Sequence, residues 1–235
     1  MYVKIKNIMK ECCSKMDDII ITYASETKEA NNLYFYDLFF ENFKNIEAIC
    51  NNIDIKAYSQ ACSTLRNAIE QVCILKVLYD NRNVLDSYKK FADLKLALIK
   101  DKEKYKNELE DFFKKRKIKN VSKRNYLDFG WLETLSVENI SIEEILKIAN
   151  FDDLILWRRY LNEFVHKTIS VMSFKDDGLI ILINKVIHIT ATLFDYLVCM
   201  FHNFTGFSFI LDGINYHEEY SFSFKSINEY EKKHV

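Results

Sequence analysis

Proline is absent from this chain of 235 residues, and glycine occurs only four times. Average usage would supply roughly ten or more of each in a chain of this length. β-Sandwiches and β-barrels need both residues at their many turns, so their scarcity argues against those folds. Long helices joined by short loops need few of either. The composition therefore predicts an all-α protein.

Several motifs that carry catalytic or cofactor chemistry are also absent from the sequence. The glycines at 130, 178, 206 and 213 are isolated, so the chain has no glycine-rich phosphate loop and no G-x-S-x-G nucleophile elbow. Neither HExxH nor CxxC occurs, and Glu143-Glu144 lacks the ExxH partner of a di-iron site. We therefore expect no cofactor and no metal.

Cysteine and charge place further limits on the class of protein. The six cysteines have no paired spacing and are predicted to be small buried hydrophobic residues in a reducing compartment. The N-terminus is polar and charged, without the pattern of a signal peptide, so we expect a cytoplasmic protein. The net charge is −1, which excludes binding of polyanions by the charge of the protein as a whole.

One apolar run, 179–204, is long enough to span a bilayer. It is interrupted by Asn184, Lys185, His188 and Asp195, each of which is costly in lipid. The pattern favours a helix buried in a bundle and no stable membrane insertion. A membrane-associated or sensor subunit is the alternative.

Apolar residues recur at three- and four-residue spacing over most of the chain, which is typical of amphipathic helices. The expected helices cover 2–24, 27–51, 53–79, 84–119, 141–150, 151–172 and 179–204, with a turn at Asn51-Asn52 and a capping box of Ser141 with Glu144. The short loop between the last two helices predicts that they are antiparallel neighbours, which would bring His188 near the face that carries His166. A dense aromatic stripe in the helix at 27–51 is expected to lie in the core. No composition break suggests a second domain. We therefore predict one up-and-down helical bundle over residues 1–204.

The last residues, 205–235, change period. Residues 207–211 and 220–224 alternate in steps of two around Asp212-Gly213 and a polar segment. This alternation predicts two short strands, a small β-hairpin-like appendage whose exposed edge would support dimer formation.

The sharpest chemical pattern lies in the helix expected at 151–172. Arg159, Asn162, Glu163 and His166 stand there against an apolar background. At about 100° per residue, seven steps bring arginine and histidine to within roughly 20° of each other on one helical face. Such a pair is suited to binding a phosphate and moving a proton beside it.

Two other groups of charged residues stand out. Arg66 and Glu70 are spaced i, i+4 in an otherwise apolar helix, so they are candidates for a polar pocket inside the bundle. Residues 114–124 form the one strongly basic segment, which is either a solvated helix end or a surface for RNA phosphates. Its basic members are Lys114, Lys115, Arg116, Lys117, Lys119, Lys123 and Arg124.

The run R-x(6)-H from Arg159 to His166 resembles the signature of the HEPN superfamily of helical domains. FGWLETL at 129–135, followed by YLNEFVH at 160–166, also resembles a bacterial family with YGWL and Y-x-x-S-x-x-VH segments. That family tends to carry an earlier R-x-x-x-E helix, matched here by Arg66 and Glu70. Tyr160 stands where HEPN ribonucleases usually have a small polar residue.

The resemblance implies a metal-independent endoribonuclease that acts as a toxin or phage-defence effector. His166 would be the general acid or base, Arg159 would stabilise the phosphorane and Asn162 would orient the phosphate or the imidazole. Arg66, Glu70, Tyr160 and Glu163 would support them. Such sites generally form across a homodimer, and an antitoxin or defence-system protein would be a further partner.

A non-catalytic reading of the same residues stays open. Arg66, Glu70 and His166 would then form a buried polar network within a helical module that binds a nucleotide or a protein. The two readings differ in where they place His166. Catalysis requires Arg159 and His166 to be exposed, whereas the network requires His166 to be buried.

Overall fold

A computed structural model describes residues 2–101, 106, 110, 123–137, 139–166, 174–208, 210–211 and 214–215. The described residues are all-α, as the composition predicted, apart from two strands of two residues each. Its contacts divide it into two compact units. The first unit is Met1–Leu75 with Asp153–Val235, and the second is Lys76–Asp152. The sequence predicted a single bundle over 1–204 because no composition break marks either boundary of the second unit.

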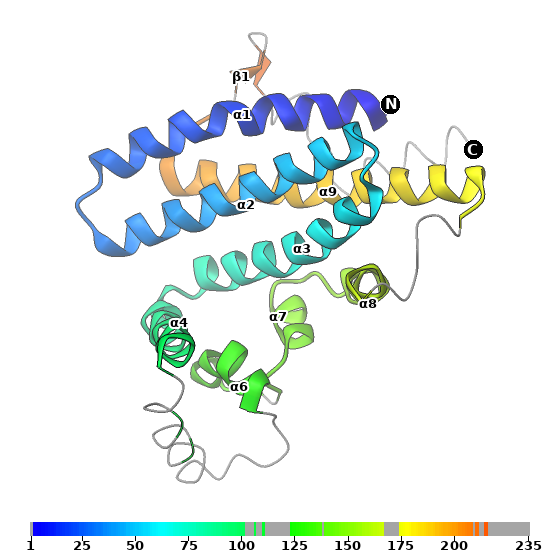
Figure 1. The fold of residues 1–235 in the computed structure, drawn as a ribbon. Helices are drawn as coiled ribbons and strands as arrows, with labels where there is room; N and C mark the ends of the chain where they lie inside the picture. Colours follow the sequence, from blue (N-terminus) through cyan, green and yellow to red (C-terminus); the bar gives the residue numbers. More distant parts are fainter. Residues whose placement is uncertain are drawn as a thin grey trace. The chain divides into compact units, whose positions relative to one another are not determined.

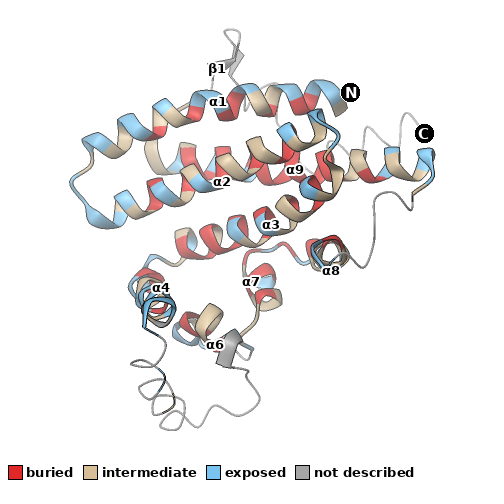
Figure 2. Cartoon of the chain, viewed as in Figure 1, coloured by how far each residue is buried: buried red, intermediate tan, exposed pale blue. Residues whose placement is uncertain are grey.

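The first unit is built on three long helices that lie side by side, α1 (Tyr2–Glu26), α2 (Ala30–Asp54) and α9 (Asp176–Thr205). The short connection at 27–29 makes α1 and α2 an antiparallel pair, and α9 packs against both (Figure 1). Their buried residues recur along each helix, as Figure 2 shows, and most of these residues are apolar. The predicted bundle core is therefore present in this unit.

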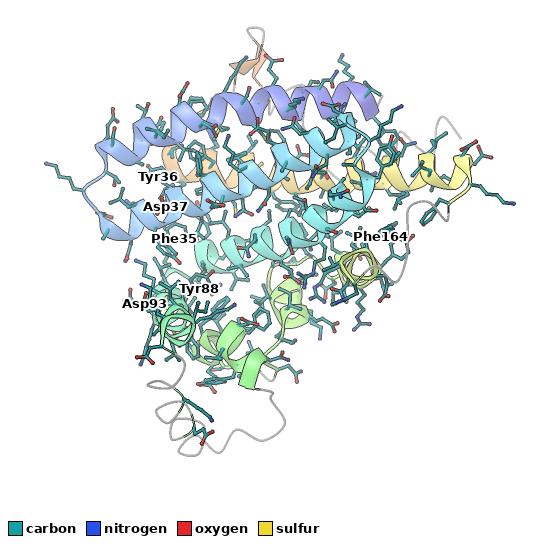
Figure 3. All side chains as sticks on the ribbon, in the orientation of Figure 1. Phe35, Tyr36, Asp37, Tyr88, Asp93 and Phe164 are labelled. Atoms are coloured by element: carbon teal, nitrogen blue, oxygen red, sulfur yellow. The ribbon has the colours of Figure 1, made fainter. Side chains whose placement is uncertain are left out.

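Aromatic side chains fill the contact between α2 and α9. Phe35 and Tyr36 on α2, labelled in Figure 3, meet Phe204 with ring centroids 5.6 and 5.2 Å apart. One turn further along, Phe39 meets Phe201 edge to face at 5.2 Å. Pairs of this geometry contribute beyond the area that they bury. The predicted core role of the aromatic stripe is confirmed for its buried members, which are Phe35, Tyr36, Phe39 and Phe43.

Helix α9 is long and apolar enough to cross a bilayer by length and composition. Within the protein, 56% of its most apolar stretch is buried, and α1 and α2 pack on the helix. Helix α9 therefore packs into the bundle along the buried part of its surface.

Burial also accounts for the cysteines. All six lie in described residues, none forms a disulfide, and all except Cys199 are buried. Burial raises the pKa of Cys12, Cys50 and Cys62 to about 12. These thiols are therefore neutral core residues at ordinary pH, as their sequence context predicted.

Helices α3 (Tyr58–Asp80) and α8 (Leu154–Val165) complete the helical part of the first unit, to which α3 contributes its residues up to Leu75. The sequence predicted that α8 and α9 would be antiparallel neighbours. This prediction is wrong, because α8 is seen end-on in Figure 1 while α9 runs across the view. The cause is that α8 is tied to α3 by side-chain contacts described below.

The second unit is a cluster of short helices around two buried aromatic residues. Its elements are η1 (Arg82–Val84), α4 (Leu85–Lys100), α6 (Lys123–Phe129), η2 (Gly130–Leu135) and α7 (Ile142–Ile148). Trp131 meets Tyr88 edge to face at 5.2 Å, and Tyr126 meets Phe91 at the same distance. The predicted cap of α7 is present, since the Glu144 N–H donates to Ser141 Oγ at 3.2 Å. The FGWL segment is therefore part of a small core.

Several predicted boundaries differ from the structure. Helix α4 ends at Lys100, where Asp101 leaves the helical conformation, so the single helix predicted to Lys119 is too long. The turn after α2 is at 55–57 rather than at Asn51-Asn52, because Lys56 adopts a positive φ of 59° there. Strand β1 (Ile210–Leu211) pairs antiparallel with β2 (Ile214–Asn215), closer in sequence than predicted. Residues 220–224 lie outside the described residues.

An ion-pair cluster joins α1 to α2 and generates a test by pH. Asp54 at the end of α2 accepts from Lys6 and from Lys10, the latter at 2.7 Å. The hydrogen bonds from these ammonium groups lower the pKa of Asp54 below its ordinary 3.8, and the bond to Asp54 raises the pKa of Lys10 above 10.5. Because folding lowers the carboxyl pKa, the ion pair stabilises the fold at pH values above the ordinary carboxyl pKa. This stabilisation is lost as the pH falls through the lowered pKa. Because folding raises the ammonium pKa, the same pair stabilises the fold at pH values below the ordinary ammonium pKa. This stabilisation is lost as the pH rises through the raised pKa.

We predict that Asp54→Asn lowers the free energy of unfolding at pH 7 by about 1 kcal/mol or less, because solvent screens this pair. The difference from wild type narrows as the pH falls below about 4 and the carboxyl becomes protonated. Urea unfolding between pH 2 and pH 8 measures it. Glu11→Gln is the control, since Glu11 pairs with Lys15 within one exposed turn. A difference that stays constant down to pH 2 would contradict the assignment.

Gly130 generates a second test, because a Cβ at this position would lie 2.5 Å from Phe91 Cε1 and 3.1 Å from Tyr126 Cε2. Both rings are buried and stiff, so we predict that Gly130→Ala destabilises the protein by about 1–3 kcal/mol. Gly178→Ala in α9 is the matched control, because its Cβ would meet Phe174 no closer than 3.4 Å and alanine favours the helix. Thermal unfolding followed by circular dichroism compares the two, and equal melting temperatures would refute the prediction.

Candidate functional site

Helix α8 presents two different faces. Leu154, Leu161 and Phe164 are buried, as their helical spacing predicts. His166 is the C-terminal cap that follows Val165, and its N–H donates to the Asn162 carbonyl oxygen at 3.1 Å. The face that carries the candidate catalytic residues therefore lies at the exposed side of a short, well-anchored helix.

Arg159 and His166 are both exposed. Seven helical steps separate them, which corresponds to about 10 Å along the axis. Asn162 and Glu163 lie between them and are half-buried. The helix therefore brings the predicted R-x(6)-H residues to one solvent-facing side of α8.

Tyr160 is half-buried beside this face. Its ring meets Trp157 at 5.7 Å and Phe164 at 5.6 Å, both edge to face, and Phe164 (Figure 3) stacks on Phe174 at 6.4 Å. Burial, followed by the proximity of Cys62 on α3, raises the pKa of Tyr160. The two ring contacts of Tyr160 are therefore within α8, and its half-buried hydroxyl lies on the side of the helix near α3.

Glu70 on α3 is the centre of the polar contact between α3 and α8. Its Oε1 atom accepts from Arg66 Nη2 at 2.8 Å, and from Nε and Nη2 of Arg158, both at 2.7 Å. The side chains of Arg66, Glu70 and Arg158 are 23%, 14% and 16% exposed, so solvent reaches all three. Arg66 also donates from Nη1 to Asn67 Oδ1 at 2.9 Å. We call these three charged residues the Glu70 cluster.

The sequence predicted a polar network of Arg66 and Glu70 with a buried His166. Arg66 and Glu70 do pair, but His166 is exposed, and the third member of the cluster is Arg158. Arg158 was not among the predicted site residues, because the R-x(6)-H pattern begins at Arg159. The signal was in the pattern, since Arg158 follows Leu154 by four residues and precedes Leu161 by three. That spacing places Arg158 on the buried side of the helix.

The basic segment remains outside this description. Lys114, Lys115, Arg116, Lys117 and Lys119 lie outside the described residues. Lys123 and Arg124 begin α6, but their side chains are not described. The predicted RNA-binding role of this segment stays a prediction.

Among the described residues, no group of three or more His, Cys, Asp or Glu side chains is arranged so that it could hold a metal ion.

His188 was predicted to approach the face that carries His166. It is buried in α9, at 2% exposure. It therefore lies in the core of the first unit.

Comparison with known proteins does not assign the chain to a family, since no family model, no curated protein and no solved structure matches it. Function must therefore be argued from the site itself.

The Glu70 cluster generates a test of stability. We predict that Arg158→Gln lowers the free energy of unfolding by about 1–2 kcal/mol, because it removes two charge-assisted hydrogen bonds to the half-buried Glu70 carboxylate. The ion pair between Glu70 and Arg66 remains in this variant. Arg159→Gln, the same change at the exposed neighbouring position, should stay within about 0.5 kcal/mol of wild type. Urea unfolding measures both. A larger loss for Arg159→Gln than for Arg158→Gln would contradict this placement.

Proposed function

We propose that the protein is a metal-independent endoribonuclease of the HEPN kind, acting as a toxin or phage-defence effector in the cytoplasm. The observation that supports the proposal most is the joint exposure of Arg159 and His166 on one face of α8. A helix anchored on its other side holds both groups in a fixed relation, which a catalytic pair requires.

The chemistry would be transesterification at an RNA phosphodiester. His166 takes the proton of the ribose 2′-hydroxyl, whose oxygen attacks the adjacent phosphorus. The bond from phosphorus to the 5′-oxygen breaks, leaving a 2′,3′-cyclic phosphate and a 5′-hydroxyl. Arg159 stabilises the negative charge on the pentacoordinate phosphorus, and Asn162 orients the phosphate or the imidazole. No oxidant, reductant or cofactor is needed for this balance.

The departing 5′-oxygen needs a proton from a second acid. In a homodimer, His166 of the partner subunit would supply it, so that one histidine acts as base and the other as acid. The basic segment 114–124 would gather the RNA backbone. An antitoxin or defence-system protein would cover the face between Arg159 and His166.

A second candidate is a helical binding module without catalysis. The observation in its favour is the Glu70 cluster, whose ion pairs join α8 to α3. These residues then have a structural role and need not take part in a reaction. In that case Arg159 and His166 belong to a surface that binds a nucleotide or a protein. The two candidates differ in whether RNA is cut.

The deciding experiment is cleavage of bulk cellular RNA by purified protein in excess EDTA. We predict that wild type cuts RNA and that His166→Ala lowers the rate roughly 10²- to 10⁴-fold, the usual contribution of a general acid or base. Arg159→Ala should lower the rate by roughly 10²- to 10³-fold through lost charge stabilisation.

Lys15→Ala is the matched control, because it removes one exposed cation from α1 and should leave the rate unchanged. Circular dichroism confirms that each variant is folded, which we expect because both target side chains are exposed. Cleavage that survives in folded His166→Ala, or its absence in wild type, would refute the ribonuclease and favour the binding module.

A further inference from the structure

The exposed face of α8 carries a carboxylate between its two basic residues. Glu163 follows Arg159 by four residues and precedes His166 by three, so it lies within about 60° of each around the helix. Arg159 and His166 are exposed and Glu163 is half-buried, so solvent reaches all three. A carboxylate repels a phosphate. The part of an RNA strand that faces Glu163 must therefore differ from the part that faces Arg159.

Glu163 has no partner that would account for its place on this face. Within the described part of the chain, its carboxylate forms no hydrogen bond or ion pair. Arg159 stands four residues earlier, at the spacing of a helical ion pair, yet the two side chains do not pair. Both carboxylate oxygens of Glu163 are therefore available as acceptors although the residue is half-buried. A ligand with two neighbouring N–H donors compensates the partial burial of such a charge.

An exposed apolar side chain lies on the same side of α8. Leu156 is 73% exposed and precedes Glu163 by seven residues. This spacing places the two within about 20° of each other and about 10 Å apart along the axis. Side chains lean toward the N-terminus of a helix, so the Glu163 carboxylate reaches back toward Leu156. An apolar contact beside a pair of acceptors suits a nucleobase, which has an apolar face and a polar edge.

Among the RNA bases, guanine has the edge that matches a carboxylate. Its N1–H and its N2 amino group are adjacent donors, so the two oxygens of one carboxylate can accept from both. Adenine and cytosine each place one amino group beside an acceptor, and uracil places one N–H between two acceptors, which a carboxylate repels. In single-stranded RNA these Watson–Crick edges are open to recognition by side chains.

We propose that Glu163 accepts hydrogen bonds from an unpaired guanine of a single-stranded RNA whose backbone lies at Arg159 and His166, with Leu156 against the face of the base. The inference rests on the proposed function in that the ligand is RNA, but it does not require that RNA be cut. It makes Glu163 a residue that determines base specificity. A structural role for Glu163 would change the stability of the protein and leave its preference among bases unchanged.

The test uses short fluorescein-labelled 2′-O-methyl oligouridylates with guanosine, inosine or adenosine at one central position. These strands lack the attacking hydroxyl and stay intact, and their affinities are measured by fluorescence anisotropy. We expect wild type to bind the guanosine strand roughly tenfold more tightly than the adenosine strand, as for one bidentate pair between a side chain and a base. Inosine keeps N1–H but lacks the N2 amino group, so its strand should fall between the two.

Glu163→Gln provides the second arm. Glutamine offers one acceptor and one donor, which no longer match guanine, so the guanosine and adenosine strands should bind within about twofold of each other. The adenosine strand should bind more tightly than it does to wild type, because a negative charge beside the RNA backbone has been removed. Glu41→Gln is the matched control, since it removes an exposed carboxylate on α2 and should leave the preference for guanosine unchanged.

Equal binding of the three strands by wild type would overturn the proposal, as would a preference for guanosine that persists in folded Glu163→Gln. If Glu163→Gln does not fold, the comparison of guanosine with inosine needs wild type alone. Equal affinity for those two strands would also overturn the proposal, because a bidentate contact requires the N2 amino group.

Competition separates a guanine in a strand from a free nucleotide. GMP should displace the guanosine strand only at concentrations far above that of the unlabelled strand, because GMP lacks the neighbouring phosphates. Displacement by GMP at the same concentration as the strand would overturn the proposal and assign the site to a mononucleotide.

Cleavage of unmodified RNA, measured in parallel, keeps the two proposals apart. Cleavage by wild type without any preference for guanosine refutes the role of Glu163 and leaves the ribonuclease standing. A preference for guanosine that depends on Glu163, without any cleavage, supports the role of Glu163 and refutes the ribonuclease.

Discussion

Three N–H groups on one oxygen of Glu70 determine how the candidate site is presented. Two of them come from Arg158 on α8 and one from Arg66 on α3, at 2.7 to 2.8 Å. Because charge-assisted hydrogen bonds are directional, they fix the rotation of α8 about its own axis as well as its position. Arg159, one residue along, then points to solvent together with His166. Each other feature of the site depends on that rotation.

The remaining packing of the first unit supports this contact without specifying it. Helices α1, α2 and α9 bury apolar and aromatic residues against one another, and such packing tolerates exchanges of similar volume. Trp157, Tyr160 and Phe164 make edge-to-face contacts with one another along α8, on the side away from Arg159 and His166. The scaffold thus provides rigidity, and the Glu70 cluster provides orientation.

The helices could be predicted because their evidence is local. Apolar spacing and the lack of proline gave the all-α class, and the Ser141 cap is contained in four residues. The path of α8 could not be predicted in this way, because it depends on a contact between Glu70 and Arg158, 88 residues apart. The short link to α9 suggested antiparallel neighbours, but a long-range ion pair decided otherwise.

The candidate site was predicted in its residue types and missed in one member. The common helical face of Arg159 and His166 follows from their spacing alone, whereas the sequence left open whether that face is exposed. The role of Arg158 depends on which face of α8 is buried. Two adjacent arginines can be told apart only by the spacing of the apolar residues around them, which shows which arginine lies on the buried face. Glu70 was singled out correctly as a charge in an apolar helix, but its partner across the fold was not.

The measurement that tests this account most directly is a double-mutant cycle between Glu70 and Arg158, with both residues replaced by glutamine singly and together and stability read from urea unfolding. The account predicts a coupling free energy of about 1.5–3 kcal/mol, the range for hydrogen bonds to charged groups. The same cycle between Glu70 and Arg159 should be additive to within about 0.5 kcal/mol. An additive cycle for Glu70 and Arg158 would contradict the claim that their contact orients α8.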